Sequence, residues 1–208
     1  MHDEDRPTPE RFELSGGALC LDFANTWGNQ LDPGSDRLRD YEYLLAFGRQ
    51  SGYLTEDPAA ALSRAADGNS AIAAETFSLC LDLRRVIYRI FSSRAKGLAI
   101  PPEDIGRINA MLGEALSHRR LAPNEGGFVW SWSEIDANDL RAPIWPVIES
   151  AAALLTSTDL KRIRECDAGD CNWLFLDRSR AGTRRWCSMS SCGNRAKARR
   201  FYSRQRKS

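Results

Sequence analysis

The chain has 208 residues, 42% of them hydrophobic and 27% charged, and a formal net charge of +1. This is the composition of an ordinary globular protein, and the length accommodates one domain of about 150 residues plus a small module. No apolar run approaches the roughly 18 residues that a membrane-spanning helix needs. The polar opening Met-His-Asp-Glu-Asp-Arg-Pro also lacks the apolar segment of a secretory signal, so we expect a cytoplasmic protein with reduced thiols.

The small net charge conceals an uneven distribution along the chain. Residues 161–208 contain 14 Lys or Arg and 4 Asp or Glu, a net charge of +10. The first 160 residues contain 15 basic and 24 acidic side chains, a net charge of −9. A basic tail on an acidic body indicates a polyanionic partner for the tail, whereas the body itself is not expected to bind nucleic acid.

Apolar periodicity predicts a mostly helical body with one small hairpin. Apolar residues at helical spacing, bounded by capping and turn residues, favour helices over residues 18–27, 38–50, 55–66, 70–96, 101–117 and 139–156. The first of these segments also alternates as a strand would, and we favour the helix. Residues 119–122 and 128–132 are typical of two strands around a five-residue turn, 123–127. The predicted fold class is therefore mostly α with small β-hairpins (α+β).

Two polar residues, Asp22 and Asn25, lie inside the apolar segment 18–27. Buried polar groups need hydrogen-bond partners, so these side chains either bond neighbouring backbone or contact a ligand. We carry both alternatives forward, with Asp22 and Asn25 as candidate ligand-binding residues.

Four cysteines near the C-terminus form two pairs with identical spacing. Cys166 and Cys171 are separated by four residues, Cys187 and Cys192 likewise, and fifteen residues lie between the pairs. Four thiolates in two short pairs suit tetrahedral Zn²⁺, which binds sulfur at about 2.3 Å. Disulfides are the alternative, but disulfide-rich chains are usually short and secreted. The sequence therefore predicts one structural zinc on these four cysteines.

The residues around the cysteines predict a small treble-clef-like module. The apolar residues 173–176 favour a strand, the turn-rich segment 179–182 follows, and helix-forming residues begin after Cys192. We expect a hairpin between the cysteine pairs and a helix behind them, with Phe201 and Tyr202 facing the hairpin.

No pattern of catalytic residues accompanies this module. A catalytic zinc keeps one position open for water, whereas four cysteines fill the tetrahedron, and His2 and His118 are distant in sequence. No phosphate loop, dinucleotide fingerprint or Ser/His/Asp order is present. Cys20 and Cys80 have apolar neighbours and are expected to be buried and unreactive. We therefore expect a protein that is not an enzyme.

The basic residues of the module indicate nucleic-acid binding. Guanidinium groups can hold phosphates bidentately, and a basic helix fits the major groove of duplex DNA. One candidate group lies in the turn of the predicted hairpin and the other on the C-terminal helix: Arg178, Arg180, Arg184, Arg185, Arg195, Lys197, Arg199, Arg200 and Arg204.

Two motifs resemble a known family. Cys192-Gly-Asn-Arg195, with Arg185-Trp-Cys187 and the upstream pair, resembles the CGNR zinc finger. The segment Gly17-Ala-Leu-Cys-Leu-Asp-Phe-Ala-Asn-Thr26 is similar to the start of the ABATE domain that accompanies that finger. The resemblance covers nearly the whole chain and implies stress-induced bacterial transcription regulators.

Together these observations predict a DNA-binding regulator with two parts. Residues 1–157 would form a sensor or dimerisation domain, and residues 158–208 the zinc finger. The expected partners are duplex DNA, at the nucleoid, together with a small-molecule effector and a second copy of the chain. The alternatives are an RNA-binding or protein-interaction module with purely structural zinc and, third, an enzyme in the body.

Overall fold

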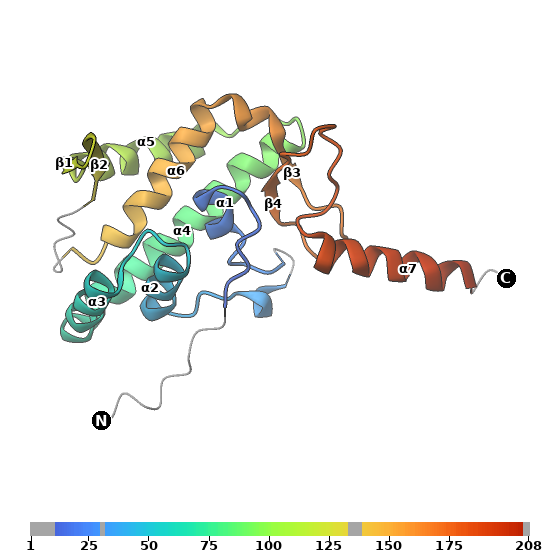
Figure 1. Ribbon diagram of the computed structural model, residues 1–208. Coiled ribbons are helices and arrows are strands. Elements are labelled where there is room, and N and C mark those ends of the chain that lie inside the picture. Colours follow the sequence, from blue (N-terminus) through green and yellow to red (C-terminus); the bar gives the residue numbers. More distant parts are fainter. Residues whose placement is uncertain (1–10, 30–31, 133–138, 206–208) are drawn as a thin grey trace.

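The computed structural model describes residues 11–29, 32–132 and 139–205 (Figure 1). Its α-helices are α1 (Leu19–Ala24), α2 (Tyr41–Gln50), α3 (Glu56–Gly68), α4 (Ser70–Ala95), α5 (Pro102–Ser117), α6 (Trp145–Thr156) and α7 (Asn194–Gln205). Short 3-10 turns cover Pro33–Ser35, Ala142–Ile144 and Thr158–Arg162. Two antiparallel two-stranded sheets, β1–β2 and β3–β4, complete the fold over these ranges, which confirms the predicted fold class.

The body is built around α4, its longest helix. The buried face of α4 carries apolar side chains at helical spacing, among them Leu83, Ile87, Ile90 and Phe91. Helices α1, α2, α3 and α5 pack against α4, and α6 packs against α1 and α5 (Figure 1). None of the helices in the described ranges is both long and apolar enough to cross a bilayer.

Helix boundaries follow local capping chemistry. The predicted helix 38–50 begins at Tyr41 because the Asp40 side chain accepts a hydrogen bond from the Tyr43 backbone N–H at 3.1 Å. The predicted helix 139–156 begins only at Trp145. Residues Ala142–Ile144, which include Pro143, form a 3-10 turn instead, and Pro146 stands in the first turn of α6, where no backbone N–H is needed.

The first hairpin differs from the prediction in its turn. Strand β1 (Arg120–Asn124) pairs with β2 (Gly127–Ser131), and Asn124 is opposite Gly127. The loop therefore has two residues, Glu125 and Gly126, and the expected five-residue turn is wrong. The positive φ of Gly127, 146°, is open to glycine and lets pairing start directly after the loop.

The second sheet corrects the predicted module. Strand β4 (Leu174–Leu176) pairs with β3 (Ile163–Glu165), which precedes Cys166, and no strand is present between Leu176 and Cys187. The Cys166–Cys171 turn thus lies inside the hairpin, not before it. Ile163, Leu174 and Leu176 belong to the main core with the body helices, because β3 packs on α4. Independent folding of residues 1–157 stays a prediction.

Candidate metal centre

Two short turns bring the four cysteines together. In the first, the Cys171 N–H donates to the Ala168 carbonyl at 3.0 Å, and the chain turns back from β3 to β4. In the second, Ser188 caps the turn Met189–Gly193, which leads directly into α7. A Cβ at Gly193 would lie 2.9 Å from the Met189 sulfur, so glycine lets the turn close behind Cys192.

The sulfur positions match a tetrahedral zinc site. All four Sγ atoms lie within 4.8 Å of one another, and Cys187 is 3.6 Å from both Cys171 and Cys192. Ligands at 2.3 Å from a tetrahedral Zn²⁺ are about 3.8 Å apart, whereas a disulfide holds its sulfurs at about 2.05 Å. All six cysteines are unbridged, and the four that cluster are buried. The residues therefore fit one structural zinc, as predicted.

The pKa values of the clustered cysteine thiols indicate that the site needs a positive charge. Hydrogen bonds from the Cys171 and Cys187 thiols lower the pKa of Cys166 to about 2. Donation to Cys166 raises the pKa values of Cys171 and Cys187 above that of an ordinary thiol. Four sulfurs this close can be thiolates together only beside a positive charge, and Zn²⁺ supplies it.

Further donors orient the ligands. The Cys187 backbone N–H lies 3.4 Å from the Cys166 sulfur, and the Arg195 guanidinium donates to the Cys192 sulfur at 3.1 Å. Asp170 holds Arg195 and Arg199 at 3.7 and 3.1 Å, and hydrogen bonding from Arg199 lowers the pKa of the Asp170 carboxyl. The first turns of α7 are thereby fixed to the metal turn.

Arg184 is part of the module's own packing. Its guanidinium lies 4.5 Å from the centre of the buried Phe175 ring and donates to the carbonyls of Trp186 and Cys187, the former at 2.9 Å. These contacts close the segment 178–186 over a small second core around the cysteines. Two of the Arg184 nitrogens, Nε and Nη2, are thus engaged within the module, and phosphate binding by Arg184 stays a prediction.

The other predicted nucleic-acid residues differ in the contacts that they make. Arg178 donates to the Gly17 carbonyl of the body at 3.1 Å, and Arg185 forms an exposed ion pair with Asp167. Arg180, Lys197 and Arg200 are exposed and have no ion-pair partner in the described ranges. Three further residues lie on α7, as Lys197 and Arg200 do. Arg195 and Arg199 are bound to Asp170, and the Arg204 side chain lies outside the described part of the structure.

The side chains of Asp22 and Asn25, two candidate ligand-binding residues, both form hydrogen bonds with backbone groups. The Asp22 carboxylate accepts the Gly16 N–H at 2.7 Å, and burial raises its pKa to about 6. The Asn25 amide bonds both backbone groups of Leu174. Cys20 and Cys80 are fully buried, and desolvation raises the pKa of each to about 12, as expected for unreactive thiols.

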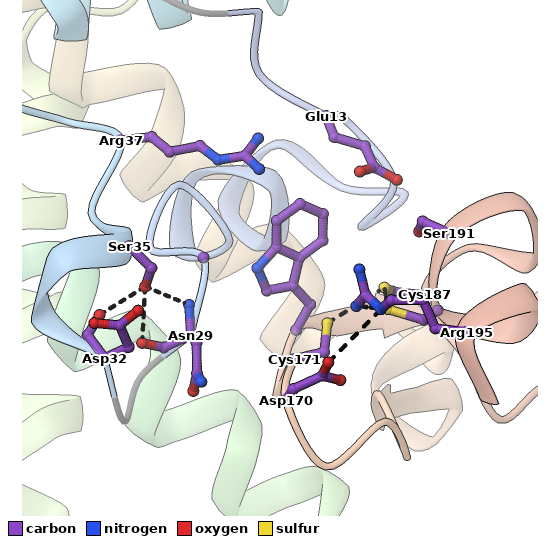
Figure 2. Close-up of a pocket in the computed structure, with 13 residues that line it drawn as sticks. Glu13, Asn29, Asp32, Ser35, Arg37, Asp170, Cys171, Cys187, Ser191 and Arg195 are labelled. Atoms are coloured by element: carbon purple, nitrogen blue, oxygen red, sulfur yellow. Dashed lines mark hydrogen bonds and ion pairs between the residues drawn. The ribbon is translucent and has the colours of Figure 1, made fainter. Parts of the chain in front are cut away.

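A cleft of about 380 Å³ lies between the metal turns and the body segments 28–29 and 32–37. Figure 2 shows Glu13 and Arg37 on the body side and Arg195 beside Cys171, Cys187 and Asp170 on the other. The Arg37 guanidinium lies over the Trp173 ring at 5.6 Å, and neither Glu13 nor Arg37 has an ion-pair partner among the described residues. Asp22 and Asn25 do not line this cleft. No sequence signal marked Glu13 or Arg37, because only the tertiary fold brings them to the metal turns.

These features define a protein with a helical body and a four-cysteine zinc module. The family model ABATE, described as "putative stress-induced transcription regulator", matches residues 17–158, and the CGNR zinc-finger model matches residues 162–205. Because the first match covers more than half of the sequence, the chain belongs to the ABATE family, and it carries a CGNR zinc finger at its C-terminal end. No curated protein matches the chain.

Proposed function

We propose that the protein is a transcription regulator whose zinc module binds duplex DNA through α7. The observation that carries this proposal is the charge and exposure of that helix. Its 12 residues include five basic and no acidic side chains, and it extends away from the body (Figure 1). The major groove is about 12 Å wide and admits one α-helix, and exposed cations along such a helix neutralise the flanking phosphates.

The contacts that hold the start of α7 in place support DNA recognition by a helix of fixed orientation. The turn Met189–Gly193 leads directly into α7, and Asp170 forms ion pairs with Arg195 and Arg199 near the start of the helix. Lys197 and Arg200 then carry exposed charges without ion-pair partners in the described part of the chain. A pre-oriented helix loses less conformational freedom on binding than a free tail does.

We assign additional phosphate contacts to two arginines of the segment after β4. Arg180 is exposed and unpaired in the described ranges. Arg185 pairs with Asp167, with both side chains about half exposed, and such pairs contribute roughly 0–1 kcal/mol, so Arg185 can exchange its carboxylate for a phosphate. To bind a phosphate, Arg178 would have to give up its bond to the Gly17 carbonyl of the body. Arg184 would have to give up its contacts with Trp186 and Phe175 inside the module.

Selection of bound sequences from a random duplex pool, with full-length zinc-loaded protein at near-physiological salt, tests this function. An enriched motif is expected, and Arg200→Ala should weaken its binding, whereas Arg64→Ala on the body should not. Charge alone gives sequence-blind binding with a Kd of roughly 10⁻⁴–10⁻⁶ M. Affinity that follows salt without any enriched motif would contradict a sequence-specific regulator.

Exposed aromatic rings on α7 favour a second candidate, single-stranded RNA. Phe201 and Tyr202 do not face the hairpin as predicted: they are 58% and 63% exposed, beside Arg200. Stacking of unpaired bases on such rings contributes about 1–3 kcal/mol per base. Tighter binding to single strands than to duplex, lost in Phe201→Ala and Tyr202→Ala, would favour this candidate.

We further propose that the body has a sensing role and no catalytic one. Four cysteine sulfurs would occupy every position of a tetrahedral zinc, and His118, which stacks on Trp145, is not part of the cysteine cluster. The cleft in Figure 2 is the candidate effector site, since Arg195 and Asp170 line it and also hold α7. A polar effector contacting Glu13 and Arg37 would quench Trp173 fluorescence, and Trp173→Phe would remove that change. A response to cellular stress follows from the family description, and a bacterial source stays an expectation from the resemblance of the two motifs.

A further inference from the structure

The β1–β2 hairpin carries an apolar face that nothing in the described chain covers. Alternate residues of its two strands share one face: Leu121 and Pro123 on β1, Phe128 and Trp130 on β2. Leu121, Phe128 and Trp130 are 61%, 74% and 63% exposed. No third strand joins this sheet within the described ranges, and the hairpin lies at the opposite end of the molecule from α7 (Figure 1).

The two edges of this hairpin are not equivalent. In a hairpin with a two-residue loop, the residues next to the loop form a hydrogen-bonded pair, and paired and outward-facing residues alternate from there. By this rule the register directs the backbone groups of Leu121 and Pro123 outward from β1, and those of Phe128 and Trp130 outward from β2. Proline has no N–H, so the β1 edge is incomplete, whereas the β2 edge offers two complete residues.

The β2 edge is complementary to itself. When two β2 strands run antiparallel with Val129 on a two-fold axis, Phe128 of one copy is opposite Trp130 of the other, and both pairs exchange two hydrogen bonds. Aromatic side chains opposite each other on one face stabilise an antiparallel pair. The apolar faces of the two hairpins then join into one. A two-stranded hairpin alone is marginally stable, so two further strands stabilise each of them.

Within the hairpin and its described ends, the net charge is too small to repel a second copy. Residues 119–132 contain Arg119, Arg120 and Glu125, a net charge of +1. The Arg119 side chain is already bound, to Glu149 and over the rings of Trp130 and Trp132 at 5.4 and 4.7 Å. Since like charges near an interface repel, a nearly neutral, aromatic edge suits a copy of itself better than it suits a strongly charged partner.

We propose that two copies of the chain associate through their β2 strands, with Phe128 opposite the Trp130 of the second copy, to form one four-stranded antiparallel sheet. This association is independent of the proposed DNA binding and leaves α7 of each copy at the far ends of the dimer.

Sedimentation of the full-length, zinc-loaded protein at micromolar concentration tests the association. The wild-type protein is expected at twice the chain mass of 23.3 kDa. Trp130→Glu should sediment as a monomer with unchanged zinc content and helical circular dichroism. Leu98→Glu is the matched control, because Leu98 is 61% exposed and lies beyond the other end of α5, and it should remain dimeric. A monomeric wild-type protein, or a Trp130→Glu protein that stays dimeric, would overturn the proposal.

Disulfide trapping tests the register. Val129→Cys places two thiols across the two-fold axis, where Cα atoms of an antiparallel pair lie about 4.5 Å apart, within disulfide range. Ala122→Cys on β1 is the control, because Ala122 is opposite Val129 and on the same face of the sheet. In the four-stranded sheet the two Ala122 positions would be three strand spacings, or about 14 Å, apart. Rapid cross-linking of Val129→Cys alone is expected on a non-reducing gel. Equal or absent cross-linking in both variants would show that the hairpins do not pair edge to edge and would overturn the proposal.

Discussion

Asn25 forms two hydrogen bonds with Leu174, donating to its carbonyl at 2.8 Å and accepting its N–H at 2.9 Å. The side-chain amide thus acts as one residue of a neighbouring strand for β4. Both residues are buried, Asn25 in the ABATE domain and Leu174 in the zinc finger. Trp173 adds a bond from its indole N–H to the Trp27 carbonyl at 3.1 Å. The finger is therefore attached to the body through its backbone, and a substitution in one of the two parts should change the stability of the other.

Asn25→Ala is expected to lower the free energy of unfolding by about 2–4 kcal/mol. The substitution leaves a buried N–H and a buried carbonyl of Leu174 without partners, and each such group costs about 1–3 kcal/mol. Chemical denaturation followed by circular dichroism measures the loss. Asn69→Ala, at an exposed position between α3 and α4, is the control and should change stability by less than about 1 kcal/mol. Equal stability of the two variants would show that the Asn25 pairing does not hold the finger to the body.

Cys187→Ser is expected to abolish zinc binding and to unfold the module. Structural zinc contributes about 10–16 kcal/mol of apparent folding free energy in small modules. Leu174 and Leu176 are part of the main core, so the melting temperature of the body helices should also fall. Metal analysis should find one zinc per wild-type chain, and a chelator should reproduce the loss until zinc is added back. Purified protein without zinc, or with a Cys166–Cys171 disulfide, would contradict the metal centre.

Arg184→Ala is expected to destabilise the zinc module by about 1–3 kcal/mol. The change removes the donors to the Trp186 and Cys187 carbonyls and uncovers the Phe175 ring. Competition with a chelator measures zinc retention, and thermal melting measures stability. Arg180→Ala, an exposed neighbour in the same segment, is the control and should leave both unchanged while reducing the salt slope of DNA binding by about one unit. Full stability of Arg184→Ala would contradict this structural role of Arg184.

Asp22→Asn is expected to stabilise the protein at pH 7. Burial raises the pKa of the folded-state Asp22 carboxyl from 3.8 to about 6, so the folded state binds more protons than the unfolded state between these values. The contribution of Asp22 to stability is therefore fully present below about pH 4 and declines as pH rises towards 6. Asparagine keeps an acceptor for the Gly16 N–H without the buried charge, for a gain on the order of 1 kcal/mol. Denaturation curves between pH 4 and 7 should show this decline in the wild-type protein and less of it in the variant.

The zinc ligands and most of the helices were open to prediction from the sequence, because both depend on local spacing. Cys166, Cys171, Cys187 and Cys192 lie in two short turns, where four intervening residues already bring the thiols of each pair together. The helix over α4 follows from apolar residues repeated at helical spacing and from the turn residues on either side of it.

What the tertiary structure decided are the partners of groups that lie far apart in the sequence. Local pattern assigned β4 to a hairpin with the following segment, but its backbone pairs with β3 and with the Asn25 amide 149 residues away. Charge alone made Arg184 equivalent to Arg180, whereas the fold places one over Phe175 and leaves the other in solvent. Periodicity and composition describe which residues can be buried or charged. Which backbone group or ring satisfies each of them depends on long-range packing, and that is set only when the whole core assembles.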